Sequence, residues 1–177
     1  SLRLHTTAAY LDSVVGSPFA DKLIGNSYAN ILFGGEGNDT LEGGSANDTL
    51  VGDGGDDSLV GGNENDTYLF DRTETDDLGH DTITETASAQ IETLDFSLFG
   101  EGVVVDLSIG STPQIVHVDY LTITLSSASA FDNVVGTPFD DTLQGNVSNN
   151  NVLNGGAGDD TYVFFRASNS VNLGSDT

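Results

Sequence analysis

The chain has 177 residues and carries 28 Asp and Glu side chains against four Lys and Arg, a formal net charge of −24 at pH 7. This excess of negative charge excludes binding to nucleic acid, or to an anionic membrane surface, through a basic patch. The absence of Cys excludes a disulfide framework and a thiolate zinc site, and no apolar run approaches the ~20 residues that span a bilayer. A compact chain with this charge therefore needs a bound positive partner that offsets the repulsion between its carboxylates.

The start of the sequence indicates a piece of a longer chain. It begins at Ser1 without an initiator Met, and the residues that follow lack the apolar segment and cleavage site of a signal peptide. We expect residues 1–15 to be the end of a preceding unit and residues 166–177 to be the start of the next spacer.

Residues 16–70 contain six nonapeptide repeats that follow one another without interruption. Each repeat begins with Gly, has Asp or Asn at its sixth position and has a large apolar residue at its eighth. The repeats are GSPFADKLI, GNSYANILF, GGEGNDTLE, GGSANDTLV, GDGGDDSLV and GGNENDTYL. A fixed period of this kind is typical of solenoid architectures.

The residue types of the nonapeptide suit a calcium site. Gly accepts a positive φ without a Cβ clash, so the first six residues can turn tightly with their carbonyl groups facing inward. The sixth residue then adds a hard carboxylate oxygen, the kind of ligand that Ca²⁺ prefers. The last three residues form a short strand whose central side chain points into the core.

Two nonapeptides complete one coil, so residues 18 apart lie on the same side of the stack. This spacing predicts two inner columns of apolar side chains, namely Leu23, Leu41 and Leu59, and Leu32, Leu50 and Tyr68. The predicted metal ligands at the sixth positions are Asp21, Asn30, Asp39, Asp48, Asp57 and Asp66. We expect the best ion sites to pair 34–39 with 52–57 and 43–48 with 61–66. The sites that involve 16–21 and 25–30 are expected to be weaker, since Gly is replaced there and Asn30 supplies only a neutral oxygen.

Residues 71–135 lack nonapeptides and are expected to form a β-rich spacer or cap. Leu121–Leu125 alternates apolar and Thr residues, the period of a half-buried strand. Two architectures remain open for this segment: a small sandwich-like fold, or a continuation of the roll that covers the open end of the stack. Asp81 is expected to add a carboxylate to the last coil of the first array.

A second, shorter array is expected over residues 136–165, with the segments GTPFDDTLQ, GNVSNNNVLN and GGAGDDTYV. Its predicted acidic ligands are Asp141 and Asp160, which fall on one side of the stack. Residues 11–39 return at 131–160, with an initial offset of 120 residues. This self-similarity predicts a module of that length that occurs in tandem.

The stretch GGEGNDTLEGGSANDTLVGDGGDDSLVGGNENDTY resembles the hemolysin-type (RTX) calcium-binding repeats of secreted bacterial proteins. The resemblance implies an all-β fold, in which right-handed parallel β-roll arrays are joined by a small β-rich segment. It also implies several Ca²⁺ ions as folding ligands and type I secretion to the extracellular space or the bacterial cell surface. The backbone carbonyl ligands that it implies are those of Gly35, Gly37, Gly44, Gly55, Gly62, Gly156 and Gly158. Ala46, Asp53 and Glu64 depart from the glycine pattern of the family.

The leading functional hypothesis is a calcium-dependent structural repeat of a large secreted or surface protein, of the adhesin or filament type. One alternative is a non-catalytic accessory domain of a secreted enzyme or toxin. Another is a calcium-assisted glycan-binding module, for which Phe96, Phe99 and Tyr120 are the few aromatic residues of the spacer. The expected partners are calcium ions and neighbouring tandem units or identical chains, with surface glycans under the last hypothesis.

We expect no enzymatic activity. The three histidines are far apart in the sequence, and no G-x-S-x-G nucleophile motif occurs. Adjacent acidic residues such as Asp56 and Asp57 are better explained as one metal ligand and one solvated neighbour, because only one of each pair is in phase with the repeat.

Overall fold

The computed structural model describes residues 2–3, 13–72, 77–85, 90–147 and 151–164. Every regular element within these residues is a β-strand. None of them belongs to a helix with the length and apolarity that crossing a membrane requires. Of the two segments assigned above to neighbouring units, 166–177 lies outside the described residues, and residues 2–3 and 13–15 are the described part of 1–15.

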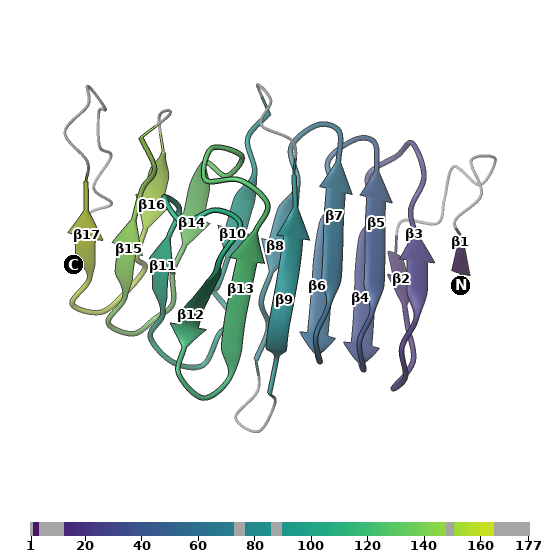
Figure 1. The fold of residues 1–177 in the computed structure, drawn as a ribbon, viewed down its shortest axis with the longest axis horizontal. Coiled ribbons are helices and arrows are strands. Elements are labelled where there is room, and N and C mark those ends of the chain that lie inside the picture. The colour runs from purple at the N-terminus through teal and green to yellow at the C-terminus, as the bar shows by residue number, and fades with distance from the viewer. Residues whose placement is uncertain (1, 4–12, 73–76, 86–89, 148–150, 165–177) are drawn as a thin grey trace.

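The strands form two long sheets that face each other, and a third, shorter sheet (Figure 1). Sheet 1 contains, in spatial order, β1 (Leu2–Arg3), β3 (Lys22–Ile24), β5 (Thr40–Gly44), β7 (Ser58–Gly62), β9 (Gly79–Thr84), β13 (Leu121–Leu125) and β12 (Pro113–His117). Sheet 2 contains β2 (Ser13–Val15), β4 (Ile31–Glu36), β6 (Thr49–Gly54), β8 (Thr67–Leu69), β10 (Thr93–Asp95), β14 (Asn133–Val135) and β16 (Val152–Asn154). Sheet 3 contains β11 (Val104–Asp106), β15 (Thr142–Gln144) and β17 (Thr161–Val163).

The strand register confirms the predicted coil of two nonapeptides. Leu41 pairs with both Leu23 and Leu59 in sheet 1, and Leu50 pairs with both Leu32 and Tyr68 in sheet 2. All of these pairings are parallel, so the chain alternates between the two sheets and advances by one strand per coil. The all-β parallel β-roll predicted from the sequence is therefore the observed fold.

The core of the array is one side chain wide on each sheet. The eighth-position residues of the six nonapeptides are at most 1% exposed, whereas the flanking strand residues, except the equally buried Val51, reach outward or are half-buried. Complete burial of one Leu contributes about 1.5–3 kcal/mol. A single file of such side chains is a small apolar core for a chain of this charge.

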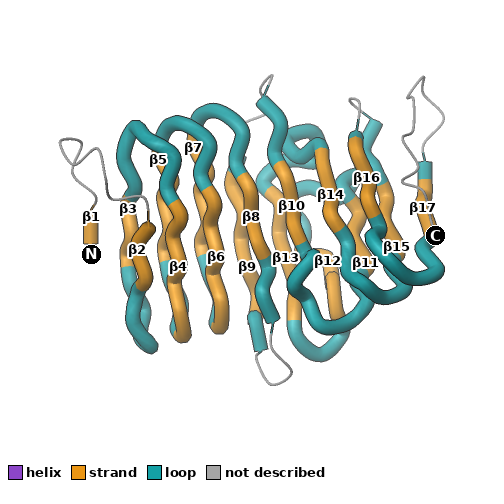
Figure 2. The backbone as a smooth tube through the Cα atoms, turned by 180° about the vertical axis from the view of Figure 1, so that it is seen from behind, coloured by secondary structure: helices purple, strands orange, loops and turns teal. Residues whose placement is uncertain are grey.

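The segment between the arrays continues the stack. In sheet 2, β10 pairs in parallel with β8 on one side and with β14 on the other (Figure 2). In sheet 1, β9 pairs with β7, with Ile83 opposite Leu59. Of the two architectures left open by the sequence, the spacer thus adopts the continuation of the roll. It joins the two arrays within one stack, so it does not end either of them.

Sheet 1 does not run the full length of the molecule. β13 pairs in parallel with β9, but β12 returns antiparallel to β13 and closes this sheet. The strands of the second array that face sheet 2 belong to sheet 3, which starts at β11. The core is wider here because aromatic side chains fill it: Phe70 stacks on Phe96 at a centroid distance of 4.6 Å, and Tyr68 meets Phe131 edge-on at 6.0 Å.

Backbone geometry repeats with the nonapeptide even where glycine is replaced. In the four repeats over residues 34–69, the second and fourth positions all have a left-handed φ, between 65° and 130°. The residues at these positions are Gly35, Gly37, Gly44, Ala46, Asp53, Gly55, Gly62 and Glu64. Ala46, Asp53 and Glu64 therefore keep the turn that glycine favours, at a cost of roughly 1–2 kcal/mol for each Cβ in this region.

Ala46→Gly should raise the free energy of unfolding by about 1 kcal/mol. Glycine relieves the strain of the left-handed φ, and this gain exceeds the cost of the extra conformational entropy that glycine gives the unfolded chain. Urea unfolding in saturating calcium measures the change. Ser45→Gly is the matched control, since Ser45 has no left-handed φ, and it should lower stability by about 0.5–1 kcal/mol. Equal effects of the two substitutions would contradict the assigned strain.

Candidate metal centre

Two rows of turns run along the stack, one at each end of the strands. The first turn row connects sheet 2 to sheet 1 or 3 and includes turns 16–21, 34–39, 52–57, 136–141 and 155–160. The second turn row connects sheet 1 or 3 back to sheet 2 and includes turns 25–30, 43–48 and 61–66, and the described residues 145–147 and 151 between β15 and β16. In Figure 1 these rows lie at the bottom and the top of the stack, respectively.

Sixth-position carboxylates line both rows and are buried. Asp39, Asp48, Asp57 and Asp66 are each at most 3% exposed. One oxygen of each accepts a backbone N–H from the sixth residue one coil earlier. In the first row, the N–H groups of Asp21 and Asp39 donate to Oδ1 of Asp39 and Asp57, both at 2.7 Å. In the second row, the N–H groups of Asn30 and Asp48 donate to Oδ1 of Asp48 and Asp66 at 2.7 and 2.8 Å.

The second oxygen of each of these carboxylates is buried and has no hydrogen-bond partner. The atoms are Oδ2 of Asp39, Asp48, Asp57, Asp66 and Asp160. An unpaired polar group costs several kcal/mol to bury, and a charged one costs more. Five such oxygens at equivalent positions of a repeat indicate a positively charged ligand rather than a local defect.

The space in front of each unpaired oxygen is kept open by the first glycine of the repeat. A Cβ added to Gly34 would overlap Oδ2 of Asp39 and would lie 2.6 Å from the carbonyl oxygen of Gly52, one coil further on. A Cβ added to Gly43 would lie 2.5 Å from Oδ2 of Asp48 and 2.7 Å from the carbonyl oxygen of Gly61. A carboxylate oxygen and a carbonyl oxygen from consecutive coils therefore face one small space.

Electrostatics also favours a cation in these spaces. Burial, with a further contribution from neighbouring carboxylates, raises the pKa of Asp57 and of Asp66 to about 7. Burial alone raises the pKa of Asp48 to about 6. The ion pairs of Lys22 and Arg72 are with Glu42 and Glu101, whose side chains are 39% and 48% exposed and lie outside both rows of sixth-position carboxylates.

Hard oxygen donors from carboxylates and carbonyls are the ligand set of Ca²⁺. A sequence model of the RTX calcium-binding nonapeptide repeat family matches residues 15–50, 34–68 and 128–162, which together are just over half of the chain. The chain belongs to this RTX family. Calcium is therefore the ion that its nonapeptides bind, and the open spaces in the two rows fit it. No curated protein matches the chain.

The first two RTX repeats differ from the other four. Oδ2 of Asp21 accepts hydrogen bonds from the N–H and the hydroxyl of Ser17, at 2.8 and 2.7 Å, and these bonds lower the pKa of Asp21. Oδ1 of Asn30 accepts the N–H of Asn26 at 2.8 Å. Both side chains thus have donors within their own turns, and the weaker ion sites expected there stay a prediction.

In the first turn row, the second RTX array contains one turn with a local hydrogen bond to its carboxylate and one turn that resembles the regular repeats. Oδ2 of Asp141 accepts the N–H of Thr137 at 2.6 Å, as Asp21 does with Ser17. Asp160 resembles the regular repeats, since its Oδ1 accepts the N–H of Asp141 at 3.0 Å and its Oδ2 is unpaired. Its turn also has a left-handed φ at Gly156 and Gly158.

The predicted carbonyl ligands belong to the glycines with left-handed φ. Some of their carbonyls already take part in the backbone network: the carbonyl of Gly44 accepts the N–H of Asn63 at 3.1 Å. A carbonyl oxygen has two lone pairs, so one such hydrogen bond still leaves an acceptor site.

Carboxylates outside the nonapeptides extend both rows. Asp81, expected from the sequence, is 1% exposed, and its Oδ1 accepts the N–H of Asp57 at 3.0 Å. Burial and the charge of Asp57 raise its pKa to about 9. Glu92 was missed, although its Oε2 accepts the N–H of Asp66 at 2.8 Å. The tripeptide Glu-Thr-Leu at 92–94 repeats the Asp-Thr-Leu of 48–50 with one added methylene, and this similarity is the pattern that could have identified it.

Asp57→Asn should raise the calcium concentration at the folding midpoint by at least about tenfold, as expected for loss of an interaction with a charged group worth ~1.5–3 kcal/mol. A calcium titration followed by circular dichroism measures the midpoint. Asp56→Asn removes the same charge from an exposed neighbour, whose Oδ1 accepts only the N–H of His80. It should shift the midpoint less than about twofold. Equal midpoints for the two variants would argue against Asp57 as a ligand.

Proposed function

We propose that this chain is a calcium-dependent structural module of a large secreted or cell-surface bacterial protein, of the adhesin or filament type, and that it folds on binding Ca²⁺. The observation that carries the proposal is the pair of turn rows with buried, unpaired carboxylate oxygens on either side of a narrow core. In the proposed module, ions between consecutive coils join the turns, while the apolar columns join the sheets.

The balance of forces supports folding on calcium rather than calcium binding to a preformed scaffold. Without ions, each turn row holds carboxylates of successive coils against one another in a region of low exposure, where their ionised form is unfavourable, as the raised pKa values of Asp57 and Asp66 indicate. The free energy of ion binding then becomes folding free energy, because the unfolded chain does not hold these oxygens together. Extracellular calcium modules typically bind with dissociation constants of ~10⁻⁴–10⁻³ M, which would keep such a chain unfolded inside the cell and fold it outside.

The internal duplication supports a tandem arrangement of modules. β2, β3 and β4 of the first unit correspond to β14, β15 and β16 of the second, and both units lie in one continuous stack. Even the local hydrogen bond from position two to the acidic sixth residue is repeated, from Ser17 to Asp21 and from Thr137 to Asp141. A chain of such units would form an elongated element whose stiffness depends on calcium, and this is what an adhesin stalk or a filament requires.

The glycan-binding alternative has less support. Phe96 and Phe99 are at most 1% exposed and pack in the core. Tyr120 stacks on His117 at a centroid distance of 4.8 Å, and the guanidinium of Arg72 lies over the same tyrosine ring, 3.3 Å from its centroid. These aromatic side chains are occupied with internal packing, so they do not offer a surface on which a sugar ring could stack.

Removal of calcium with excess EGTA should abolish the β-sheet circular dichroism of the 177-residue chain and increase its hydrodynamic radius. The physical reason is the uncompensated charge in both turn rows. Restoring Ca²⁺ should reverse both changes, whereas Mg²⁺ should not, because it demands octahedral geometry and gives up its waters reluctantly. A chain that stays compact and β-rich in EGTA would contradict the proposed function.

A further inference from the structure

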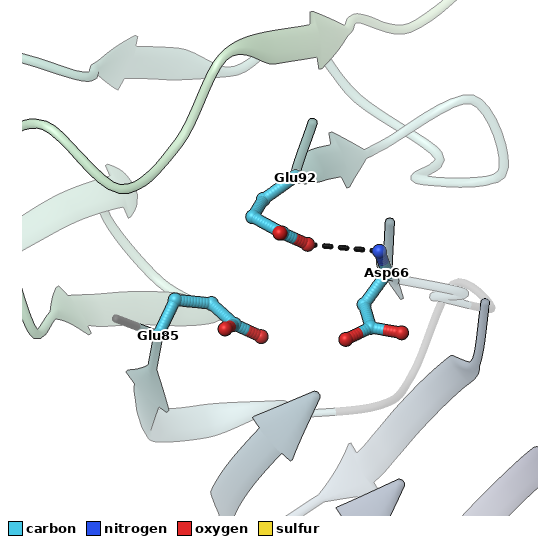
Figure 3. A group of neighbouring side chains, drawn as sticks. All are labelled: Asp66, Glu85 and Glu92. Carbon is cyan, nitrogen blue, oxygen red and sulfur yellow. Dashed lines mark hydrogen bonds between the residues drawn. The ribbon is translucent and has the colours of Figure 1, made fainter. Parts of the chain in front are cut away.

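Three buried carboxylates meet where the second turn row leaves the nonapeptide array. They belong to Asp66 of the last repeat, Glu85 directly after β9 and Glu92 directly before β10 (Figure 3). One oxygen from each lies within 4.8 Å of the others. Two of these three residues lie outside the nonapeptides, so the repeat pattern does not account for the cluster.

Glu92 occupies the place of the next sixth-position residue. The N–H of Asp66 donates to its Oε2 at 2.8 Å, as the N–H of Asp48 donates to Oδ1 of Asp66. The following residue keeps the same pattern, since the N–H of Thr93 donates to the carbonyl of Asp66 at 3.0 Å. Glu92 therefore extends the second-row series that the nonapeptides begin, and the series continues to Asp132, whose Oδ2 accepts the N–H of Glu92 at 3.3 Å.

Glu85 occupies the place of the next first-position glycine. Val60 pairs with Thr84, so Glu85 lies at the level of Gly61 on the neighbouring strand. Its Oε1 accepts a hydrogen bond from the hydroxyl of Tyr68 and a longer one, at 3.4 Å, from the N–H of Gly62. A Cβ added to Gly61 would overlap both Oε1 of Glu85 and Oδ2 of Asp66. The two carboxylates thus face the same space, which glycine keeps open.

A separate observation indicates that this space takes a ligand. Asp66 is 1% exposed, and its Oδ2 has no hydrogen-bond partner. Figure 3 shows that the carboxylates of Asp66 and Glu85 point toward each other, while Glu92 approaches from the adjacent strand. Three like charges at this spacing repel one another strongly unless a cation lies between them.

We propose that Asp66, Glu85 and Glu92 form a calcium site of their own, which joins the segment between the arrays to the last nonapeptide. Its protein ligands are carboxylate oxygens, the donors that hard cations such as Ca²⁺ select over softer metals. The site differs from those between nonapeptides, in which a backbone carbonyl of the next coil faces the carboxylate. It goes beyond the proposed function, because it assigns an ion to residues that the RTX repeats do not include.

The site has a structural consequence for the spacer. Glu85 follows β9 and Glu92 precedes β10, so one ion would hold both strands of this coil against β7 and β8. The coil is longer than a pair of nonapeptides, since Glu92 follows Asp66 at a sequence separation of 26. An ion at the end of the regular array would compensate for the glycines of a regular second-row turn, which residues 85–92 do not contain.

Calorimetric titration of the full chain with CaCl₂ tests the site by stoichiometry. The double variant Glu85→Gln/Glu92→Gln should bind one ion fewer than the unchanged chain. The control, Glu36→Gln/Glu64→Gln, removes the same charge from two exposed turn residues and should bind the same number of ions as the unchanged chain. Equal stoichiometry in the site variant and the control would overturn the inference. If the unchanged chain binds no calcium, the proposed function itself fails.

Terbium provides a second measurement that does not depend on the folding of the double variant. Tb³⁺ takes calcium sites, and the hydroxyl of Tyr68 contacts Glu85, so excitation of this ring should sensitise terbium bound in the cluster. Tyr68→Phe should remove most of that emission while leaving calcium stoichiometry unchanged. Tyr162→Phe, which alters the equivalent ring beside Gly155 in the second array, serves as the matched control. Terbium emission that is unaffected by Tyr68→Phe would overturn the site.

Discussion

Each regular sixth-position carboxylate receives a backbone N–H on one oxygen and no donor on the other, and the remainder of the structure depends on this asymmetry. The hydrogen bond fixes the carboxylate to the coil before it, as in the 2.7 Å contact from Asp39 N–H to Asp57 Oδ1. The unpaired oxygen is then directed into the space beside the first glycine of its own turn. Burial of both oxygens is unfavourable without a cation, and a cation shared by two coils converts the same geometry into a cross-link.

The apolar core and the turn rows therefore have different roles. The columns of Leu side chains keep the two sheets in register, but they are narrow, and repulsion between carboxylates acts at both ends of the coils that span residues 34–69. The segment between the arrays has a wider core, in which Phe70, Phe96 and Phe99 pack together. This part carries fewer glycine turns and depends more on ordinary packing, so the two kinds of coil are expected to respond differently to calcium.

The nonapeptide arrays were predictable because a fixed period determines both which residues pair and which face inward, as Leu41 and Leu59 illustrate. The continuation of the roll through the spacer was not predictable. There β10 joins β8 to β14 through coils of unequal length, so no fixed sequence period relates the paired residues. Glu92 was missed for the same reason: its hydrogen bond to Asp66 depends on spatial register and not on an 18-residue interval.

The stability of the chain as a function of free calcium concentration tests the central claim most directly. If ions between the coils supply the folding free energy, the free energy of unfolding should rise by about 1.4 kcal/mol per bound ion for each tenfold increase in calcium above the dissociation constant. Urea unfolding at a series of buffered calcium concentrations measures this slope. The account predicts a slope that corresponds to several ions, and a stability that does not change with calcium would contradict it.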